Sequence, residues 1–342
     1  MLSQRSAAQA PNAASLLSRE LDGAYRRASD LILRAVARSV STGLVARRLD
    51  DLDAEAARVE TAGTRLTGDN AFVMALLAAL SAVMTSNRAL VGAGVGEAMA
   101  AGVTAAQRLA PAMALMGLTA QQAGVTWRTP DAGVLERVIR EPQDAALNDR
   151  LTRYETYVAL VIAGILAQGG SPTTIAANVR LAVETLPGHY ANQMLRTLQL
   201  AAYRQATALT QAANADIIAY QIRVAVLDHR TCAACWALHG TRLEVGEVVD
   251  DHPLGRCTAI AVLRGMEGTR TIERGADVFE TLDETAQRGI LGNAAYAAWV
   301  AGAVTLDDFV HRHDDALYGS MVTAASLRGI LGDAAKAYYQ RG

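Results

Sequence analysis

The sequence predicts a mainly α protein in which helical regions flank a small β-containing module. Hydrophobic residues make up 51% of the 342 residues, whereas aromatic residues make up only 5%. Alanine dominates this apolar content and has the highest helix propensity of all residues. One stretch departs from the helical pattern: Ile222, Val224 and Val226 alternate along the chain as in a strand. Residues 241–249 and 258–264 predict two further strands, so we expect a small antiparallel sheet.

The same patterns divide the chain into four expected regions. Residues 1–130 form an N-terminal Ala-rich helical region, and residues 131–218 form a central helical region. Residues 219–268 form the β-containing module. Residues 269–342 form a C-terminal helical region.

The N-terminal region begins with a predicted helix over 13–48 and continues into a long apolar segment, 70–126. Seven arginines face three acids in the helix, which suits a solvated face and leaves contact with DNA open. The apolar run 71–84 is shorter than the ~20 residues that span a bilayer. We therefore expect a buried helical hairpin or an oligomer interface, with membrane contact as the alternative. Pro111 is expected to break or kink the following helix.

Helices are also predicted over 147–168, 173–186 and 190–215. Gly169 and Gly170 end the first of these, and Ser171 followed by Pro172 is a typical helix start.

The C-terminal region carries two capping patterns and one duplicated motif. Thr281–Glu284 predicts a helix through about residue 300, and Thr305–Asp308 predicts the next one. The sequence Arg-Gly-Ile-Leu-Gly-Asx-Ala-Ala occurs at 288–295 and again at 328–335, which predicts helical hairpins that pack alike. His311 and His313, with neighbouring aspartates, suggest a second metal site, but a solvated helix end explains them better because i,i+2 side chains diverge on a helix.

All three cysteines of the chain gather near one histidine: Cys232, Cys235, His252 and Cys257. A C-x2-C pair can clamp one metal ion, and a later His and Cys can complete the tetrahedron of soft and borderline ligands that zinc prefers. With four protein ligands and no open position, such a Zn²⁺ would be structural. His239 is the competing candidate for the fourth ligand; His252 is preferred because Pro253 and Gly255 turn the chain beside it.

Other interpretations of these cysteines fit less well. A redox C-x-x-C usually opens a helix beside a βαβ pattern, which is missing here. A nucleophilic cysteine would need an oxyanion element, and none is recognisable. Three unrelated buried thiols remain as the simplest alternative.

The residues around the cluster resemble the phage head morphogenesis, or minor head protein, family, including its Mu F-like group. The family pattern is a strand ending in Asp, then Arg-Thr-Cys-x-x-Cys, Leu-x-Gly and later His-Pro-x-Cys-Arg-Cys. Here it corresponds to Asp228, Arg230–Cys235, Leu238–Gly240 and His252–Cys257. Gly255 stands where the pattern has the first cysteine of Cys-Arg-Cys. The resemblance extends over about residues 190–312.

The resemblance implies a structural minor head protein of a tailed phage or prophage, not an enzyme. It implies a virion location inside the capsid near the portal, after assembly in the host cytoplasm, with a role in head assembly and DNA packaging or delivery. Its expected partners are the portal protein and other head proteins, with self-association in the particle. The alternative is a zinc-dependent nucleic-acid-binding or processing protein, although a net charge of −2 gives no overall attraction to DNA.

Overall fold

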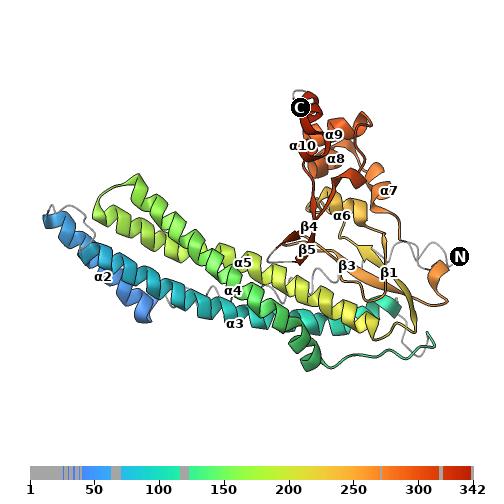
Figure 1. Ribbon diagram of the computed structural model, residues 1–342, viewed down its shortest axis with the longest axis horizontal. Helices are drawn as coiled ribbons and strands as arrows, with labels where there is room; N and C mark the ends of the chain where they lie inside the picture. The colour runs from blue at the N-terminus through green and yellow to red at the C-terminus, as the bar shows by residue number, and fades with distance from the viewer. Residues whose placement is uncertain are drawn as a thin grey trace. The chain divides into compact units, whose positions relative to one another are not determined.

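The computed structural model describes residues 26, 30, 34, 38, 41–62, 71–115, 123–269, 272–315 and 319–339. It shows a mainly helical chain with two small antiparallel sheets, as the sequence predicts (Figure 1). Most of the predicted helix over 13–48 lies outside these residues. The described chain divides into two compact units, 24–98 with 142–198 and 99–141 with 199–342. The four-region division of the sequence stays a prediction.

In the described part of the chain, four helices precede the first sheet: α2 (Gly43–Ala62), α3 (Ala71–Leu115), α4 (Ala132–Gln168) and α5 (Pro172–Ala212). The expectation of a hairpin within 70–126 is wrong over its described part, because α3 is one continuous helix of 45 residues. Pro111 lies inside α3 and does not end it. The separate helices predicted over 173–186 and 190–215 are likewise one helix, α5. Helix propensity alone does not predict where a helix ends when the residues on both sides also favour helix.

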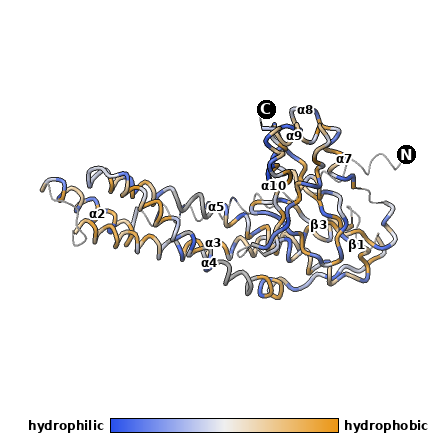
Figure 2. The backbone as a smooth tube through the Cα atoms, turned by 45° about the horizontal axis from the view of Figure 1, so that its top comes forward, coloured by the Kyte–Doolittle hydropathy of each residue, from blue (hydrophilic) through white to orange (hydrophobic). Residues whose placement is uncertain are grey.

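α3 is the one helix of the described chain that is long and apolar enough to cross a membrane. Its most apolar window has a mean hydropathy of 1.5, and 18% of that window is buried. Hydrophobic residues recur along its length (Figure 2). This statement about α3 rests on its length and composition alone.

The unit formed by 24–98 and 142–198 is built from apolar helix faces. Buried residues of α2 recur with helical spacing at Val45, Leu49, Leu52, Ala56 and Val59. Ion pairs join the helices at the surface: Arg180 binds Asp53, and the Nε of Arg88 lies 3.0 Å from Oε1 of Glu155. Exposed pairs of this kind contribute at most about 1 kcal/mol each, so the apolar faces supply most of the stability.

The other unit contains the predicted three-stranded sheet, formed by β1 (Ile218–Val224), β2 (Arg242–Leu243) and β3 (Thr258–Leu263) in the order β2-β1-β3. The strand expected over 241–249 is only two residues long, and β1 ends before Val226. Both pairings are antiparallel, with Gln221 opposite Leu243 and Ile222 opposite Ile260. The end of α3 packs on this sheet, because Ala114 and Leu115 share a core with residues of β1 and β3.

Gly102 of α3 marks a close approach to α5 within this unit. A Cβ at this position would come 2.5 Å from the carbonyl oxygen of Gln199 and 3.1 Å from the backbone nitrogen of Tyr203. Any larger residue would therefore push the two helices apart. Gly102 is therefore a small residue of the apolar segment that the packing of α3 on α5 requires.

The C-terminal region is less helical than predicted. Its helices are α7 (Gly275–Glu280), α8 (Glu284–Leu291), α9 (Asn293–Val300), α10 (Leu327–Leu331) and α11 (Lys336–Tyr339), with 3-10 turns at η1 (Glu267–Thr269), η2 (Asp307–Phe309) and η3 (Gly332–Ala335). The helix predicted from Thr305 is wrong. Asp308 does accept hydrogen bonds from the backbone and side chain of Thr305, but the turn stops at Phe309. The chain then forms an antiparallel hairpin, β4 (Val310–Asp315) and β5 (Gly319–Ala324).

The duplicated motif has a common local structure in its two copies. Each copy begins inside a short helix whose N-cap side chain accepts a backbone hydrogen bond, Asp283 from Ala286 in α8 and Ser326 from Gly329 in α10, although α8 starts further ahead of its copy than α10 does. Each helix stops at a glycine with positive φ, Gly292 and Gly332, a conformation that glycine adopts without strain. The copies differ afterwards, since α9 follows the first glycine and the 3-10 turn η3 follows the second.

Candidate metal centre

The first two cysteines lie at the start of α6 (Ala233–Leu238), with Cys232 as its N-cap residue. The preceding turn is held by Asp228, whose Oδ1 accepts hydrogen bonds from the backbone of Arg230 at 3.0 Å and the hydroxyl of Thr231 at 3.0 Å. Asx turns of this kind fix the backbone locally. The Asp-x-Arg-Thr segment therefore sets the position of Cys232, and the C-x-x-C pair spans the first turn of a short helix.

The other half of the cluster lies on the loop that enters β3. Arg256 makes two hydrogen bonds to the carboxylate of Asp228, one of them 2.7 Å long. This bidentate pair ties the loop next to Cys257 to the turn next to Cys232. It also holds the pKa of Asp228 well below its usual range, mainly through the hydrogen bond from Arg256.

The structure brings the predicted ligands together. The Nε2 of His252 lies 3.4 Å from Sγ of Cys232 and 3.7 Å from Sγ of Cys235. Cys232, Cys235 and His252 offer ligand atoms within 4.8 Å of one another, and Cys235, Asp251 and Cys257 form a second such group that shares Cys235. All three cysteines are free thiols. The cluster of Cys232, Cys235, His252 and Cys257 could therefore hold a metal ion.

The spacing fits tetrahedral zinc. With a Zn–S bond of about 2.3 Å and a Zn–N bond of about 2.0 Å, a sulfur and a nitrogen ligand lie about 3.5 Å apart. The two distances from Nε2 of His252 to the sulfurs lie on either side of this value. The cavity between these side chains has a volume of about 20 Å³, enough for one water-sized group. The space between these side chains is thus of the size of a single ion.

His252 is oriented for metal binding through Nε2. Its Nδ1 lies 2.9 Å from the carbonyl oxygen of Pro253, which can only accept, so Nδ1 carries a proton and Nε2, which faces the sulfurs, is the nitrogen available to a metal ion. Burial lowers the pKa of His252, but Cys232 and Asp251 outweigh it and raise the pKa to about 9. Hydrogen bonding from Cys235 and His252 lowers the pKa of Cys232 to about 5.

His239 has a different role. Its Nδ1 accepts a hydrogen bond from the backbone nitrogen of Ala225 at 2.9 Å, and burial lowers its pKa to about 4. It belongs to neither group of candidate ligands in the described chain. A neutral His239 therefore closes the end of β1 by accepting a backbone hydrogen bond.

Asp251 is a residue of the site that the sequence patterns did not reveal. Its carboxylate is fully buried and accepts from Nη2 of Arg204 at 2.7 Å, from the backbone nitrogen of His252 at 2.9 Å and from that of Cys257 at 3.0 Å. Arg204, which belongs to α5, also donates to the carbonyl oxygens of Gly255 and Cys257. Asp251 and Arg204 thus anchor the loop 252–257 to α5 through these hydrogen bonds. Only an acid directly before the His-Pro pair could have indicated this in the sequence.

The interpretation of His311 and His313 as part of a solvated helix end is wrong, since both lie on β4. Alternate residues of a strand point to the same face, and the two rings stack with centroids 5.2 Å apart. The two groups of three or more candidate ligands found in the described chain both lie in the cysteine cluster, so the histidine pair forms no further group.

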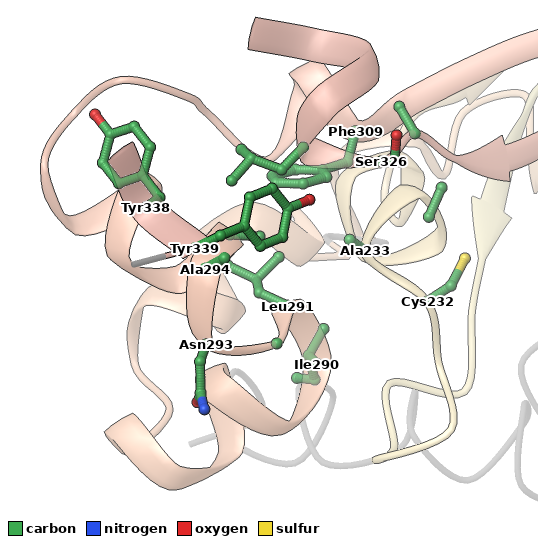
Figure 3. A pocket seen from close by; sticks show the side chains of 15 residues that line it. Cys232, Ala233, Ile290, Leu291, Asn293, Ala294, Phe309, Ser326, Tyr338 and Tyr339 are labelled. Atoms are coloured by element: carbon green, nitrogen blue, oxygen red, sulfur yellow. The ribbon is translucent and has the colours of Figure 1, made fainter. Parts of the chain in front are cut away.

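An apolar groove of about 480 Å³ borders the cluster at Cys232 (Figure 3). The first copy of the duplicated motif contributes Ile290 and Leu291 to its wall, and Leu327, the residue before the second copy, also lines it. Phe309 and Tyr339 also line it, and their side chains lie close to Leu291 in the view.

The fold and the site define a mainly helical protein whose small β-sheet module carries a closed cysteine–histidine cluster. The family described as phage Mu protein F like protein matches residues 156–260. The predicted resemblance is confirmed over these residues, which include all four candidate ligands; the match begins earlier and ends earlier than the expected 190–312. No curated protein and no solved structure matches the chain. The family match supports a phage head morphogenesis protein.

Proposed function

We propose that this protein is a structural minor head protein of a tailed phage or prophage, acting at or near the portal in head assembly and DNA packaging or delivery. The family match over residues 156–260 carries this proposal. The closed cluster supports it, because a site that leaves no open position stabilises a fold and does not turn over a substrate. The protein would act as a virion component and not as an enzyme.

The bound metal in this proposal is Zn²⁺, held by Cys232, Cys235, His252 and Cys257. When bound, the ion supplies cross-linking of segments that lack a large core of their own, a contribution on the order of 10 kcal/mol in small modules. The chain's own residues extend the cross-link. Asp251 and Arg204 join the ligand loop to α5, and Arg312 of β4 pairs with Asp250. The result would be a rigid platform for portal or other head proteins.

The rival function, a zinc-dependent nucleic-acid-binding protein, requires a basic stripe beside the metal. Four arginines cluster there in the sequence: Arg223, Arg230, Arg242 and Arg256. Arg223 is buried and paired with Asp250, and Arg256 is paired with Asp228. Two of the four are thus interior ion-pair partners, which leaves a weak positive surface for phosphates.

Quantitative mass spectrometry of purified particles of the encoding phage tests the proposed function. Wild-type particles should contain the protein, and particles made with Cys235→Ser should contain much less of it and fewer packaged genomes. An Arg242→Ser variant, altered at an exposed position of the same module, should be incorporated normally. Particles that lack the wild-type protein, or full incorporation of a zinc-free variant, would overturn the proposal.

A further inference from the structure

Arg223 has the largest of the fully buried side chains in the described chain. It lies on β1, the central strand of the sheet, opposite Ala259 of β3. Its backbone nitrogen donates to the carbonyl oxygen of Thr241 at 2.9 Å. The strand is therefore paired on both edges, which fixes the direction of the Arg223 side chain. Burial of a guanidinium group is costly unless its five N–H donors find acceptors. The surroundings of this side chain must therefore supply acceptors for these donors.

Within the described chain, one of the three guanidinium nitrogens of Arg223 has a hydrogen-bond acceptor, and the other two have none. Nη1 donates to Oδ1 of Asp250 at 2.6 Å. Nε and Nη2 have no hydrogen-bond partner among the described residues. Nη2 lies 4.0 Å from Oδ1 of Asp251, beyond hydrogen-bond distance. Asp251 accepts instead from Arg204 and from two backbone amides, which hold its carboxylate away from Nη2 of Arg223.

The unpaired side of Arg223 faces the second group of candidate ligands. Oδ1 of Asp251, 4.0 Å from Nη2 of Arg223, lies 3.5 Å from Sγ of Cys235, and the ligand atoms of Asp251, Cys235 and Cys257 lie within 4.8 Å of one another. Burial lowers the pKa of Arg223, but the negative charges of Cys257, Asp251, Cys235 and Asp250, in that order, raise it above its ordinary value. Two of these four groups are proposed metal ligands. A thiolate bound to a metal accepts N–H hydrogen bonds, and such outer partners orient ligands and tune affinity.

The formal charges around the cluster agree with this assignment. A divalent ion with three thiolates and a neutral imidazole carries one net negative charge, to which the carboxylates of Asp250 and Asp251 add two. Three arginines meet these charges: Arg204, Arg223 and Arg312. Neutral thiols without a metal would leave the arginines in excess by one. The charges around the cluster thus balance when the metal is bound.

We propose that Arg223 is a positioning residue that donates from Nε and Nη2 to the metal-bound sulfurs of Cys257 and Cys235 and thereby strengthens metal binding. The inference rests on the proposed metal site and adds an outer hydrogen-bonding partner to it. Removal of an outer partner typically costs about 10–100-fold in metal affinity. The same loss is expected here for a variant that keeps an unbranched stem of similar shape but has no N–H groups.

Competition with a chromophoric chelator tests this on the full chain, with Zn²⁺ as the probe. Arg223→Met should weaken zinc affinity by about 10–100-fold, and Arg223→Lys, which keeps the charge but not the fork, should fall between it and the wild type. Arg242→Met is the matched control, since Arg242 lies on the neighbouring strand over the ring of Tyr220. Wild-type affinity in Arg223→Met would overturn the inference.

A second measurement needs no substitution and so remains valid if Arg223→Met does not fold. The wild-type protein, labelled with ¹⁵N-arginine and loaded with ¹¹³Cd²⁺, should show a scalar coupling between the metal and the Nε–H proton of Arg223 through the sulfur. A resolved Arg223 Nε–H signal without coupling would overturn the hydrogen bond while leaving the metal site intact. A wild-type protein that binds neither Zn²⁺ nor Cd²⁺ would overturn the metal site itself.

Discussion

The carboxylate of Asp251 occupies the space where a side chain of residue 255 would have to stand. A Cβ built on Gly255 would come 2.2 Å from Cγ and from both carboxylate oxygens of Asp251. This is the position at which the family pattern has a cysteine and this chain has glycine. The glycine and the buried aspartate are therefore linked: the loop can lack the thiol because Asp251 fills its place and holds the loop through backbone hydrogen bonds.

This relationship predicts that Gly255→Ala destabilises the protein. The Asp251 carboxylate cannot move away without breaking its bond to Arg204, so we expect a loss of about 1–3 kcal/mol, as for overpacking of a core. Urea unfolding measures this directly. Gly268→Ala is the control, because a Cβ there meets nothing within 4 Å. Equal stability of the two variants would show that the loop adapts freely and that Asp251 does not constrain residue 255.

Asp251→Asn should cost considerably more than substitution of an exposed acid. It leaves the guanidinium of Arg204, whose side chain is 6% exposed, without its charged partner, and breaking a buried pair typically costs about 3–5 kcal/mol. Asp307→Asn, which removes a 4.0 Å exposed contact to Arg274, should change stability by less than about 1 kcal/mol. Denaturant unfolding of both variants gives the comparison, and similar losses would contradict the role assigned to Asp251.

His239 predicts a specific acid sensitivity. Its folded pKa of about 4 lies below its ordinary value of 6.5, so the unfolded chain takes up a proton as the pH falls below 6.5 while the folded protein does not. Stability is therefore lost from pH 6.5 down to about 4, at about 1.4 kcal/mol per pH unit for this group. His239→Asn keeps an acceptor for Ala225 but cannot titrate. The stability difference between wild type and variant should shrink or reverse by that amount as the pH falls. A difference that stays constant with pH would contradict a neutral, half-buried His239.

Local sequence patterns predicted those parts of the fold that local interactions determine. The Gly169–Gly170 stop, the three strands of the module and the cysteine–histidine cluster all depend on spacing and on residue type at neighbouring positions. Glycine breaks, strand alternation and soft-ligand chemistry can be recognised within a few residues, which is why these features were predictable.

The features that the sequence did not predict depend on contacts between segments that are distant in the chain. Arg204 and Asp251 are 47 residues apart in the chain, and nothing in either neighbourhood indicates that they meet in the interior. The capping pattern at Thr305 was recognised correctly, but whether a cap continues into a helix depends on the residues after it. Here the next residues pair with β5, so His311 and His313 lie on a strand. A capping signal marks a turn and does not fix its length.

Elemental mass spectrometry of the purified full-length protein tests the central claim most directly. We expect one zinc per chain in the wild type and in His239→Asn, and loss of zinc in Cys235→Ser, Cys257→Ser and His252→Asn. A wild-type protein that carries no metal, with three freely titratable thiols in its native state, would contradict the metal centre. The cysteine spacing would then be a coincidence, and the proposed zinc-stapled platform would have to be abandoned.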